Sequence, residues 1–403
     1  MKKKNNFKNI YLLIVSLLVS LFLIEIYMRI AKVEYPIFQT YDHNRGFALK
    51  PYSSGWWSRE GRAFVQINSQ GLRDIEHKFD KDSKTIRIAV LGDSFTEARP
   101  IPLEKTFWKL MENELNSCKP EFYNNIEVIN FGVTEYSTAQ EFITLRNNVW
   151  KYDPDIVLLA FYSGNDVSDN SKTLSRKDYR PFFSYEDNGI VIDTSFRESK
   201  DYKLLKSFSG QLVISLSAHS RLVQLLKEIY VKFRTLNFKN KKTNEAKKTI
   251  LEEYGESYIQ LYNPLTPEWV EAWKLTEDII LMMNNEVKSH NSEFIVLTLS
   301  NSRQVHPDMN YRNDFINALK IDDLFYPGKR IKNLGIKNDF KVFILAEEMQ
   351  KYAEKNNIFL HGFDNSIPEW KDKGEGHWNI EGHFIASQIA SKKICSFSKI
   401  FIE

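Results

Sequence analysis

A serine, a histidine and several amide groups of this chain have the types and spacing needed for nucleophilic chemistry. Ser94 stands in Gly92-Asp93-Ser94, directly after the apolar run 88–91. The run predicts a buried parallel strand, and the residues after it predict a tight turn into a helix. Such a turn lifts the serine hydroxyl clear of the sheet, where a nucleophile stands in an α/β hydrolase-like fold. Taken alone, the tripeptide fits an ordinary turn equally well.

Two further polar groups follow the next two predicted strands. Gly132 ends the strand 127–131, and Asn165 comes after the strand 155–161. Because the carboxyl ends of neighbouring parallel strands converge, both residues would face the cleft that holds Ser94. The N–H groups of Ser94 and Gly132 and the side chain of Asn165 would then surround a developing oxyanion. Each also has a structural interpretation, Gly132 as a loop glycine and Asn165 as a turn residue.

A histidine near the carboxyl end supplies a candidate base. His377 lies in the loop 375–379, which leads into the last predicted helix. A serine hydroxyl is a poor nucleophile without a base, and imidazole titrates in the useful range. His383 lies on the helix itself and is interpreted as a packing or capping residue. None of the remaining histidines has the spacing of metal ligands, so we expect no metal site.

The elements that must position these residues alternate between strand and helix. We expect strands at 88–91, 127–131, 155–161, 293–299 and 358–361, and helices at 103–115, 138–150, 220–233, 267–287, 340–355 and 380–394. A hairpin is expected at 182–193. This alternation predicts an α/β fold, a parallel sheet with helices on both faces.

The first 35 residues differ in kind from the rest. Four lysines precede a predominantly apolar run from Ile10 to Ile30, which reaches the roughly 20 residues that a spanning helix needs. No small-residue cleavage site follows, so we expect an uncleaved anchor in preference to a removed signal peptide. The lysines place the amino terminus in the cytoplasm and everything after about Lys32 outside it. We divide the chain into 1–34, a cytoplasmic stub and transmembrane anchor, 35–84, a lead-in, and 85–403, the catalytic-type domain with an insertion at about 167–266.

Composition narrows the choice of partners. The net charge of +3 gives no argument for nucleic acid. The 14% of aromatic residues suits a surface that stacks on sugars, although core packing is the commoner reason for such a content. Cys118 and Cys395 allow one bridge, but two inert thiols are the expectation. The basic segment 239–248 is interpreted as a solvated linker or a lid.

In their order and spacing, the blocks around Ser94, Gly132, Asn165 and His377 resemble the four blocks of the SGNH/GDSL hydrolase superfamily. The stretch 68–74 and the amino-terminal anchor resemble its membrane-tethered bacterial members. The resemblance implies a three-layer α/β/α flavodoxin-like sheet and ester or acyl chemistry, often on acylated glycans. It implies Ser94 as nucleophile and His377 as base, with an oxyanion hole made by Ser94, Gly132 and Asn165. It implies no cofactor.

The third catalytic member departs from the family pattern. The family usually has an aspartate two or three residues before the histidine, but here Gly374 and Glu375 stand nearest to His377. In acetyltransferase-like relatives with an Asp-x-His-Trp motif, the acid stands where Glu375 does. Glu375 is therefore the expected third member, and Asp372 is the fallback. A dyad with a backbone carbonyl holding the ring is also compatible with the family.

The expected function is that of a membrane-anchored, extracytoplasmic serine esterase acting on O-acyl groups of a glycan through an acyl-enzyme. An O-acyltransferase of a surface polysaccharide would use the same residues, with a sugar hydroxyl in place of water. A catalytically inactive glycan-binding or scaffold protein is the rival from another class. A lipid-directed esterase fits the anchor, but it needs an apolar patch, and the insertion shows no obvious one. Expected partners are an acylated carbohydrate or another small ester, and the membrane, with no nucleic acid.

Overall fold

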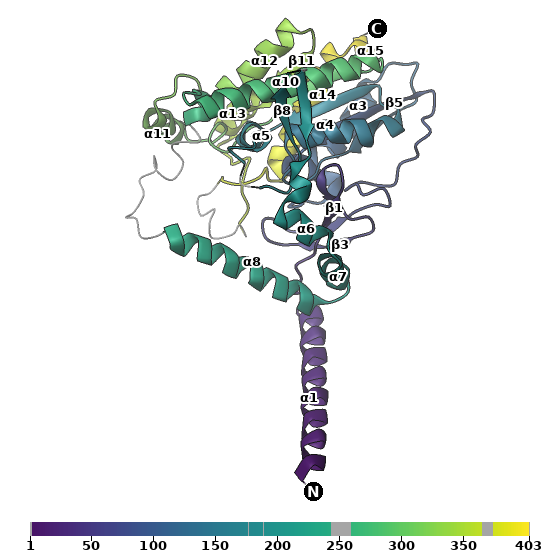
Figure 1. Cartoon of the computed structure of the whole chain (residues 1–403). Helices are drawn as coiled ribbons and strands as arrows, with labels where there is room; N and C mark the ends of the chain where they lie inside the picture. Colours follow the sequence, from purple (N-terminus) through teal and green to yellow (C-terminus); the bar gives the residue numbers. More distant parts are fainter. Residues whose placement is uncertain (1, 176, 188, 243–258, 365–373, 403) are drawn as a thin grey trace.

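A five-stranded parallel sheet forms the centre of the computed structural model, which describes residues 2–402 except 176, 188, 243–258 and 365–373 (Figure 1). The strands are β5 (Thr85–Gly92), β6 (Asn125–Asn130), β7 (Ile156–Phe161), β10 (Glu293–Thr298) and β11 (Lys341–Ile344). Their order in the sheet is β11-β10-β7-β5-β6, and every neighbouring pair is parallel. All of β7, the middle strand, is buried, which explains its unbroken apolar sequence.

Helices cover both faces of this sheet. One face packs against α4 (Thr138–Asn147), α10 (Pro267–Ser289) and α12 (Tyr326–Lys337). The other packs against α3 (Phe107–Cys118), α13 (Leu345–Asn356) and α14 (Ile380–Phe397). Each face has its own buried apolar cluster, centred on Trp273 on the first side and Trp108 on the second. The predicted three-layer α/β/α arrangement with a parallel sheet is confirmed.

The prediction of a fifth strand at 358–361 is wrong, and the helix expected over 340–355 starts only at Leu345. The fifth strand is β11, and α13 starts at the very next residue. In the described residues, the segment 358–361 contributes an isolated bridge between His361 and Trp378 instead of a strand of the sheet. No turn residue separates β11 from α13. The sequence of the short strand therefore fits the apolar spacing of the helix, and it was predicted as part of that helix.

The lead-in contributes two hairpins, β1 (Gln39–Asp42) with β2 (Gly46–Leu49), and β3 (Ser54–Trp57) with β4 (Ala63–Gln66). Phe47 and Val65 of these hairpins share a buried cluster with Val133 and Tyr136, which follow β6. The insertion holds β8 (Phe182–Glu186), β9 (Gly189–Asp193), η3 (Ser195–Glu198), α6 (Lys200–Lys206), α7 (Phe208–Ser217) and α8 (Arg221–Lys242). The remaining short elements are α2 (Ser94–Glu97), η1 (Leu103–Lys105), η2 (Val149–Tyr152), α5 (Ser163–Asn170), α11 (Met309–Leu319) and α15 (Lys399–Ile402).

The stretch 68–74 forms hydrogen bonds to the segments that follow β5 and to the end of β6. The fully buried Arg73 guanidinium donates to the backbone carbonyls of Glu97 and, at 2.6 Å, of Ile101. Asp74 accepts the backbone N–H of Asn130 at 2.9 Å. The lead-in therefore holds the two loops in place relative to each other, by hydrogen bonds to backbone groups that would otherwise be buried without a partner.

The amino-terminal helix α1 (Lys2–Ile30) extends away from the body of the protein (Figure 1). Its segment Phe7–Ile30 has a mean hydropathy of 2.5, and none of its most apolar stretch is buried against the rest of the chain. By length and composition, it is suited to cross a membrane.

The expectation of two inert thiols is wrong, because Cys118 and Cys395 form a disulfide. The bond joins the last residue of α3 to α14, two helices that pack side by side on one face of the sheet. The two cysteines are 277 residues apart in the sequence, so no local pattern could have paired them.

We predict that replacing both cysteines, Cys118→Ser with Cys395→Ser, lowers the free energy of unfolding by about 3–5 kcal/mol, because the bond closes a very long loop in the unfolded chain. Urea unfolding of the full chain in detergent measures this. A reducing agent should destabilise the wild type and leave the double variant unchanged. Two free thiols in the native, unreduced protein would contradict the pairing.

Candidate active site

The turn after β5 presents Ser94 at the carboxyl edge of the sheet. Asp93 caps α2, since its Oδ1 accepts the N–H of Phe95 at 2.9 Å. A Cβ on Gly92 would lie 2.2 Å from Thr96 Oγ1, so a residue without a side chain is needed for the chain to turn this tightly. Ser94 is the first residue of α2, and its backbone N–H has no hydrogen-bond partner among the described residues.

Ser94, His377 and Glu60 form a continuous hydrogen-bonded relay. His377 Nε2 lies 2.8 Å from Ser94 Oγ, and His377 Nδ1 lies 2.5 Å from Glu60 Oε2. The other carboxylate oxygen of Glu60 accepts the backbone N–H of His377 at 2.7 Å. Because an ionised carboxylate only accepts hydrogen bonds, Nδ1 carries the proton and Nε2 is left to accept the proton of the serine.

The acid of this relay is not the one that sequence reasoning proposed. Glu375 is directed to Arg303, with Oε1 2.5 Å from Nη2, and Asp372 lies outside the described residues. Glu60 comes from the loop between β3 and β4, 317 residues from its partner His377. Nothing in the local sequence marks Glu60 as the acid, because only the fold brings it to a histidine 317 residues away.

The loop of Glu60 is positioned by close packing against the segment after α2. Gly61 has a positive φ of 63°, and a Cβ on it would lie 2.3 Å from the carbonyl oxygen of Pro100. Any other residue at Gly61 would push the loop away from this contact. The neighbouring Glu60 is thereby held against the histidine, with 3% of its surface exposed.

The surroundings of His377 set its basicity. Burial lowers the pKa of His377, but the hydrogen bond and charge of Glu60 act in the opposite sense, helped by the charge of Asp93. The net result is a pKa raised above the ordinary value for histidine. The imidazole is therefore a stronger base than a free one, and its protonated form is stabilised by the buried carboxylate.

The three expected oxyanion donors lie in the same region, but only two are available. Asn165 Nδ2 donates one hydrogen to Asp93 Oδ2 at 2.9 Å, so its amide is held beside the Ser94 turn with a second hydrogen left. Gly132 packs against α2, where a Cβ on it would lie 2.6 Å from the side chain of Thr96. Its N–H, however, donates to Asn130 Oδ1 at 2.8 Å. Among the described residues, the backbone N–H of Ser94 and the second hydrogen of the Asn165 amide have no partner.

Buried carboxyl groups lie around the Asp93 turn. Burial raises the pKa of Asp93 to about 6, against the opposing hydrogen bonds from Phe95 and Asn165. Burial raises the pKa values of Glu141 and Asp166 well above the ordinary range, and the charge of Asp93 acts in the same sense on both. Burial therefore disfavours the charged form of all three carboxyl groups.

The loop that carries His377 is fixed by a second histidine. His361 is buried, with Nδ1 2.7 Å from the carbonyl oxygen of Gly376 and Nε2 3.1 Å from Ser300 Oγ. Burial lowers the pKa of His361 to about 3, so this ring stays neutral and structural. His383 accepts the N–H of Phe107 at 3.2 Å and is buried, which confirms its interpretation as a packing residue.

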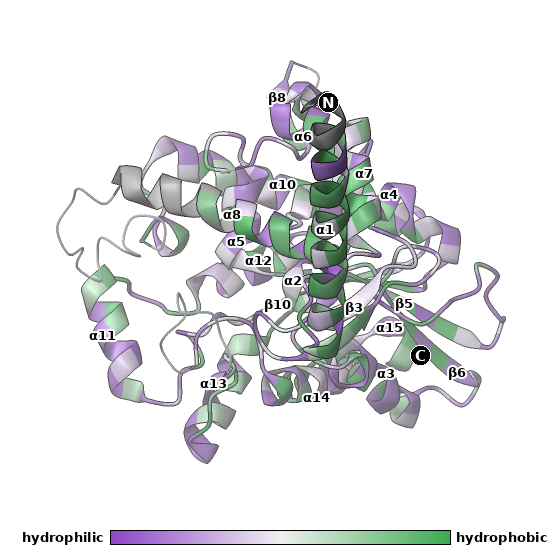
Figure 2. Ribbon diagram, turned by 90° about the horizontal axis from the view of Figure 1, so that it is seen from below, coloured by the Kyte–Doolittle hydropathy of each residue, from purple (hydrophilic) through white to green (hydrophobic). Residues whose placement is uncertain are grey.

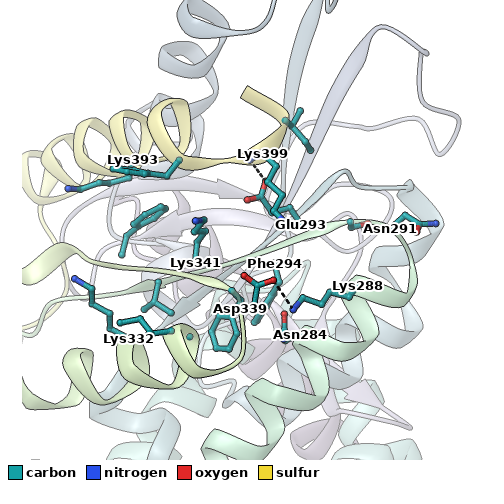
Figure 3. A pocket seen from close by; sticks show the side chains of 18 residues that line it. Asn284, Lys288, Asn291, Glu293, Phe294, Lys332, Asp339, Lys341, Lys393 and Lys399 are labelled. Carbon is teal, nitrogen blue, oxygen red and sulfur yellow. Dashed lines mark hydrogen bonds and ion pairs between the residues drawn. The ribbon is translucent and has the colours of Figure 1, made fainter. Parts of the chain in front are cut away.

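A cavity elsewhere in the fold does not belong to this site. It has a volume of about 610 Å³ and lies between α10, α12 and the start of β10 and β11, with Lys288, Lys332 and Lys341 on its wall (Figure 3). Ligands of doubly wound sheets bind at the opposite, carboxyl edge, where Ser94 lies, so this cavity is not part of the candidate site. In the described part of the chain, no group of three or more His, Cys, Asp or Glu side chains is arranged to hold a metal ion.

Only part of the basic segment 239–248, which was interpreted as a linker or a lid, belongs to the described residues. Residues 239–242 end α8, and 243–248 fall outside the described residues.

No protein-family model and no curated protein matches the chain. Among solved structures, a catalytic mutant of an acetylxylan esterase from Geobacillus stearothermophilus is 11% identical, with a TM-score of 0.36, over 77% of this chain and 94% of that one. The acetyl xylan esterase AlAXEase is 14% identical, with a TM-score of 0.34, over 76% and 99%. An alpha/beta hydrolase enzyme from the metagenome of Lake Arreo, Spain, is 11% identical, with a TM-score of 0.36, over 78% and 96%. At these TM-scores the likeness is remote and carries no functional argument.

We predict that Glu60→Gln lowers the pKa of His377, because burial then acts with little to oppose it. Titration of the chain labelled with ¹⁵N-histidine, followed by NMR in detergent, measures this. His383, whose pKa burial holds well below the ordinary value, is the internal reference and should not respond. An unchanged His377 titration in the variant would show that Glu60 does not control the ring.

Proposed function

We propose that this protein is a membrane-anchored serine esterase of the SGNH/GDSL type, acting outside the cytoplasm on ester bonds, with O-acyl groups of a glycan as its substrate class. The observation that carries the proposal is the relay from Ser94 through His377 to Glu60, with contacts of 2.8 Å and 2.5 Å at the carboxyl edge of the sheet. A glycan-binding protein without activity has no use for a nucleophile, base and acid in hydrogen-bond order.

In the proposed mechanism, Ser94 Oγ attacks the ester carbonyl while His377 Nε2 takes its proton. The negative oxygen of the tetrahedral intermediate is stabilised by the Ser94 N–H and the Asn165 amide. Collapse of the intermediate breaks the bond to the alcohol, which leaves with the proton returned by His377. Glu60 stabilises the imidazolium in between and keeps Nδ1 protonated.

The second half of the reaction releases the acyl group. A water molecule gives its proton to His377 Nε2 and attacks the acyl-enzyme on Ser94. The resulting intermediate collapses to the free acid, and His377 returns the proton to Ser94 Oγ. Gly132 would join as a third oxyanion donor once Asn130 releases its N–H. Transfer to a sugar hydroxyl would follow the same steps with the hydroxyl in place of water.

Two features support the proposed location. A disulfide such as Cys118–Cys395 persists in oxidising compartments and is rare in the cytosol. The apolar part of α1 follows lysines at the start of the helix, which favour a cytoplasmic amino terminus. We keep the division into an anchor (1–34), a lead-in (35–84) that supplies Glu60, and a catalytic domain (85–403). The glycan substrate follows from the family resemblance of the four sequence blocks.

We predict that Ser94→Ala abolishes hydrolysis of p-nitrophenyl acetate and of acetylated xylan, and that Glu60→Gln lowers kcat by about 10⁴-fold, because the tautomer of His377 is then no longer fixed. Glu375→Gln is the matched control. It makes the same carboxylate-to-amide change in a residue that binds Arg303, so we expect activity close to that of the wild type.

Each variant is first compared with the wild type by thermal unfolding, so that a loss of fold is not mistaken for a loss of chemistry. If kcat fell equally in Glu60→Gln and Glu375→Gln at equal stability, Glu60 would have no specific role in the mechanism. A folded wild type that forms acetyl-enzyme but releases acetate only when a sugar acceptor is added would replace the esterase with the transferase.

A further inference from the structure

We propose that α7, the described part of α8 and a cationic pocket at the end of α1 together form a docking surface for the anionic headgroup layer of a phospholipid bilayer. The inference rests on one part of the proposed function, that α1 spans the membrane. In this arrangement the insertion faces the lipid, and the catalytic domain keeps one orientation relative to the bilayer.

The apolar part of this docking surface consists of one stripe on each of two helices. On α7, Phe208, Leu212 and Leu216 are exposed at a spacing of four residues. On α8, Leu226, Tyr230 and Phe233 are exposed at spacings of four and three. These spacings bring the side chains of each helix onto one face. Phe208 is 85% and Tyr230 64% exposed, and apolar patches of this kind mark sites of association.

Both helices lie where a membrane would meet the body of the protein. Figure 1 shows α7 and α8 at the end from which α1 emerges, with α8 running across the direction of α1. Figure 2, seen from that end, shows hydrophobic segments on α7 and α8 around the end-on view of α1. A helix with an apolar stripe in this position lies in the plane of the interface and does not cross it.

The orientation of α8 is tied to that of α1. The carboxylate of Glu25, near the end of α1, accepts hydrogen bonds from the backbone N–H groups of Arg221 and Leu222 and from Ser220 Oγ, each at 3.0 Å. Arg29, one turn further on, donates to the carbonyl oxygen of His219 at 2.5 Å. The end of the spanning helix thus caps the first turn of α8 and fixes the angle between them.

A cationic pocket of about 310 Å³ lies at the same level. Its wall contains Arg29, Lys32, Arg62 and Arg221 with Trp56, and a single acid, Glu34. The acid is already paired with Arg221 and with the N–H of Trp56, and the guanidinium of Arg62 lies 5.2 Å from the centre of the Trp56 ring. Lys32 and Arg62 have no carboxylate partner in the described part of the chain.

The composition of this pocket matches the chemistry of lipid headgroups. Lys32 follows the last residue of α1 by two positions, so it stands at the depth of the headgroups when α1 spans the bilayer. Basic side chains at that depth attract anionic lipids, and tryptophan is enriched there because one edge of its ring is polar. Charge and depth together favour anionic phospholipid over a protein partner.

The docking surface is connected to the catalytic acid. Glu228 on α8 forms an ion pair with Arg59, the residue before Glu60.

The exposed stripes on α7 and α8 show that the expectation of no apolar patch in the insertion is wrong. The apolar residues of α7 and α8 recur at the spacing of a helix that packs on a core, but tertiary packing leaves one stripe of each uncovered.

The full-length chain in nanodiscs tests the proposal. Because both native cysteines are in a disulfide, Phe208→Cys and Tyr230→Cys each give one site for an environment-sensitive fluorophore. Phe122→Cys is the matched control, an exposed aromatic in the loop before β6, at the opposite edge of the sheet from Ser94. In discs of phosphatidylcholine with phosphatidylglycerol, nitroxides on the acyl chains should quench the labels at 208 and 230, and aqueous iodide should quench them several-fold less than the label at 122.

Two further comparisons separate the possible outcomes. Omitting phosphatidylglycerol, or combining Lys32→Gln with Arg62→Gln, should raise iodide quenching at 230, and the double variant should no longer respond to phosphatidylglycerol. The docking surface would be refuted if iodide quenched the labels at 208 and 230 as strongly as the label at 122. It would also be refuted if these labels were shielded in native membranes but not in pure lipid, because that result indicates a protein partner. Extraction of the chain from membranes by carbonate would instead refute the anchor, and none of these readings depends on esterase activity.

Discussion

The pairing of Glu60 with His377 is the interaction on which the rest of the site depends. A histidine buried without an acid would lose basicity, and its ring would be free to rotate away from Ser94. Glu60 prevents both, because one oxygen binds the ring at 2.5 Å and the other binds the backbone of the same residue at 2.7 Å. The rest of the lead-in can be understood as a support for this contact. Gly61 packs closely against the segment after α2, and Arg59 binds the loop to α8 through its ion pair with Glu228.

A second constraint is the convergence of strand ends. The loops after β5, β6 and β7 meet at one edge, and each supplies a polar group that holds its neighbour. Asp93 binds Asn165 across two of these loops, and Asn130 is bound by the lead-in residues Arg73 and Asp74. These hydrogen bonds fix the loops relative to one another, because breaking one of them leaves a buried polar group without a partner. The same network explains why the Gly132 N–H is taken by Asn130 and not left open to a substrate.

Local patterns predicted what depends on neighbours in the sequence. An apolar run followed by Gly92-Asp93-Ser94 is enough to predict a strand, a turn and an exposed hydroxyl. The next three strands of the sheet follow the same logic, but the fifth, β11, was missed. Glu60, the Cys118–Cys395 bond and the uncovered stripes of α7 and α8 depend on tertiary packing between distant segments, and no neighbouring residue records it. Glu375 shows the opposite error, because an acid in the expected position turned to Arg303, a cation that sequence could not place beside it.

The positions of the three relay residues along the chain have a consequence for its synthesis. The nucleophile at 94 is made 283 residues before the base at 377, and the acid at 60 is made earlier still. A growing chain that has not reached residue 377 therefore lacks the base of the proposed mechanism. The disulfide between α3 and α14 likewise forms only after Cys395 has been made. Assembly of the proposed site thus depends on segments that are synthesised at very different times, and it is complete only once residues 377–395 have folded onto the earlier part of the chain.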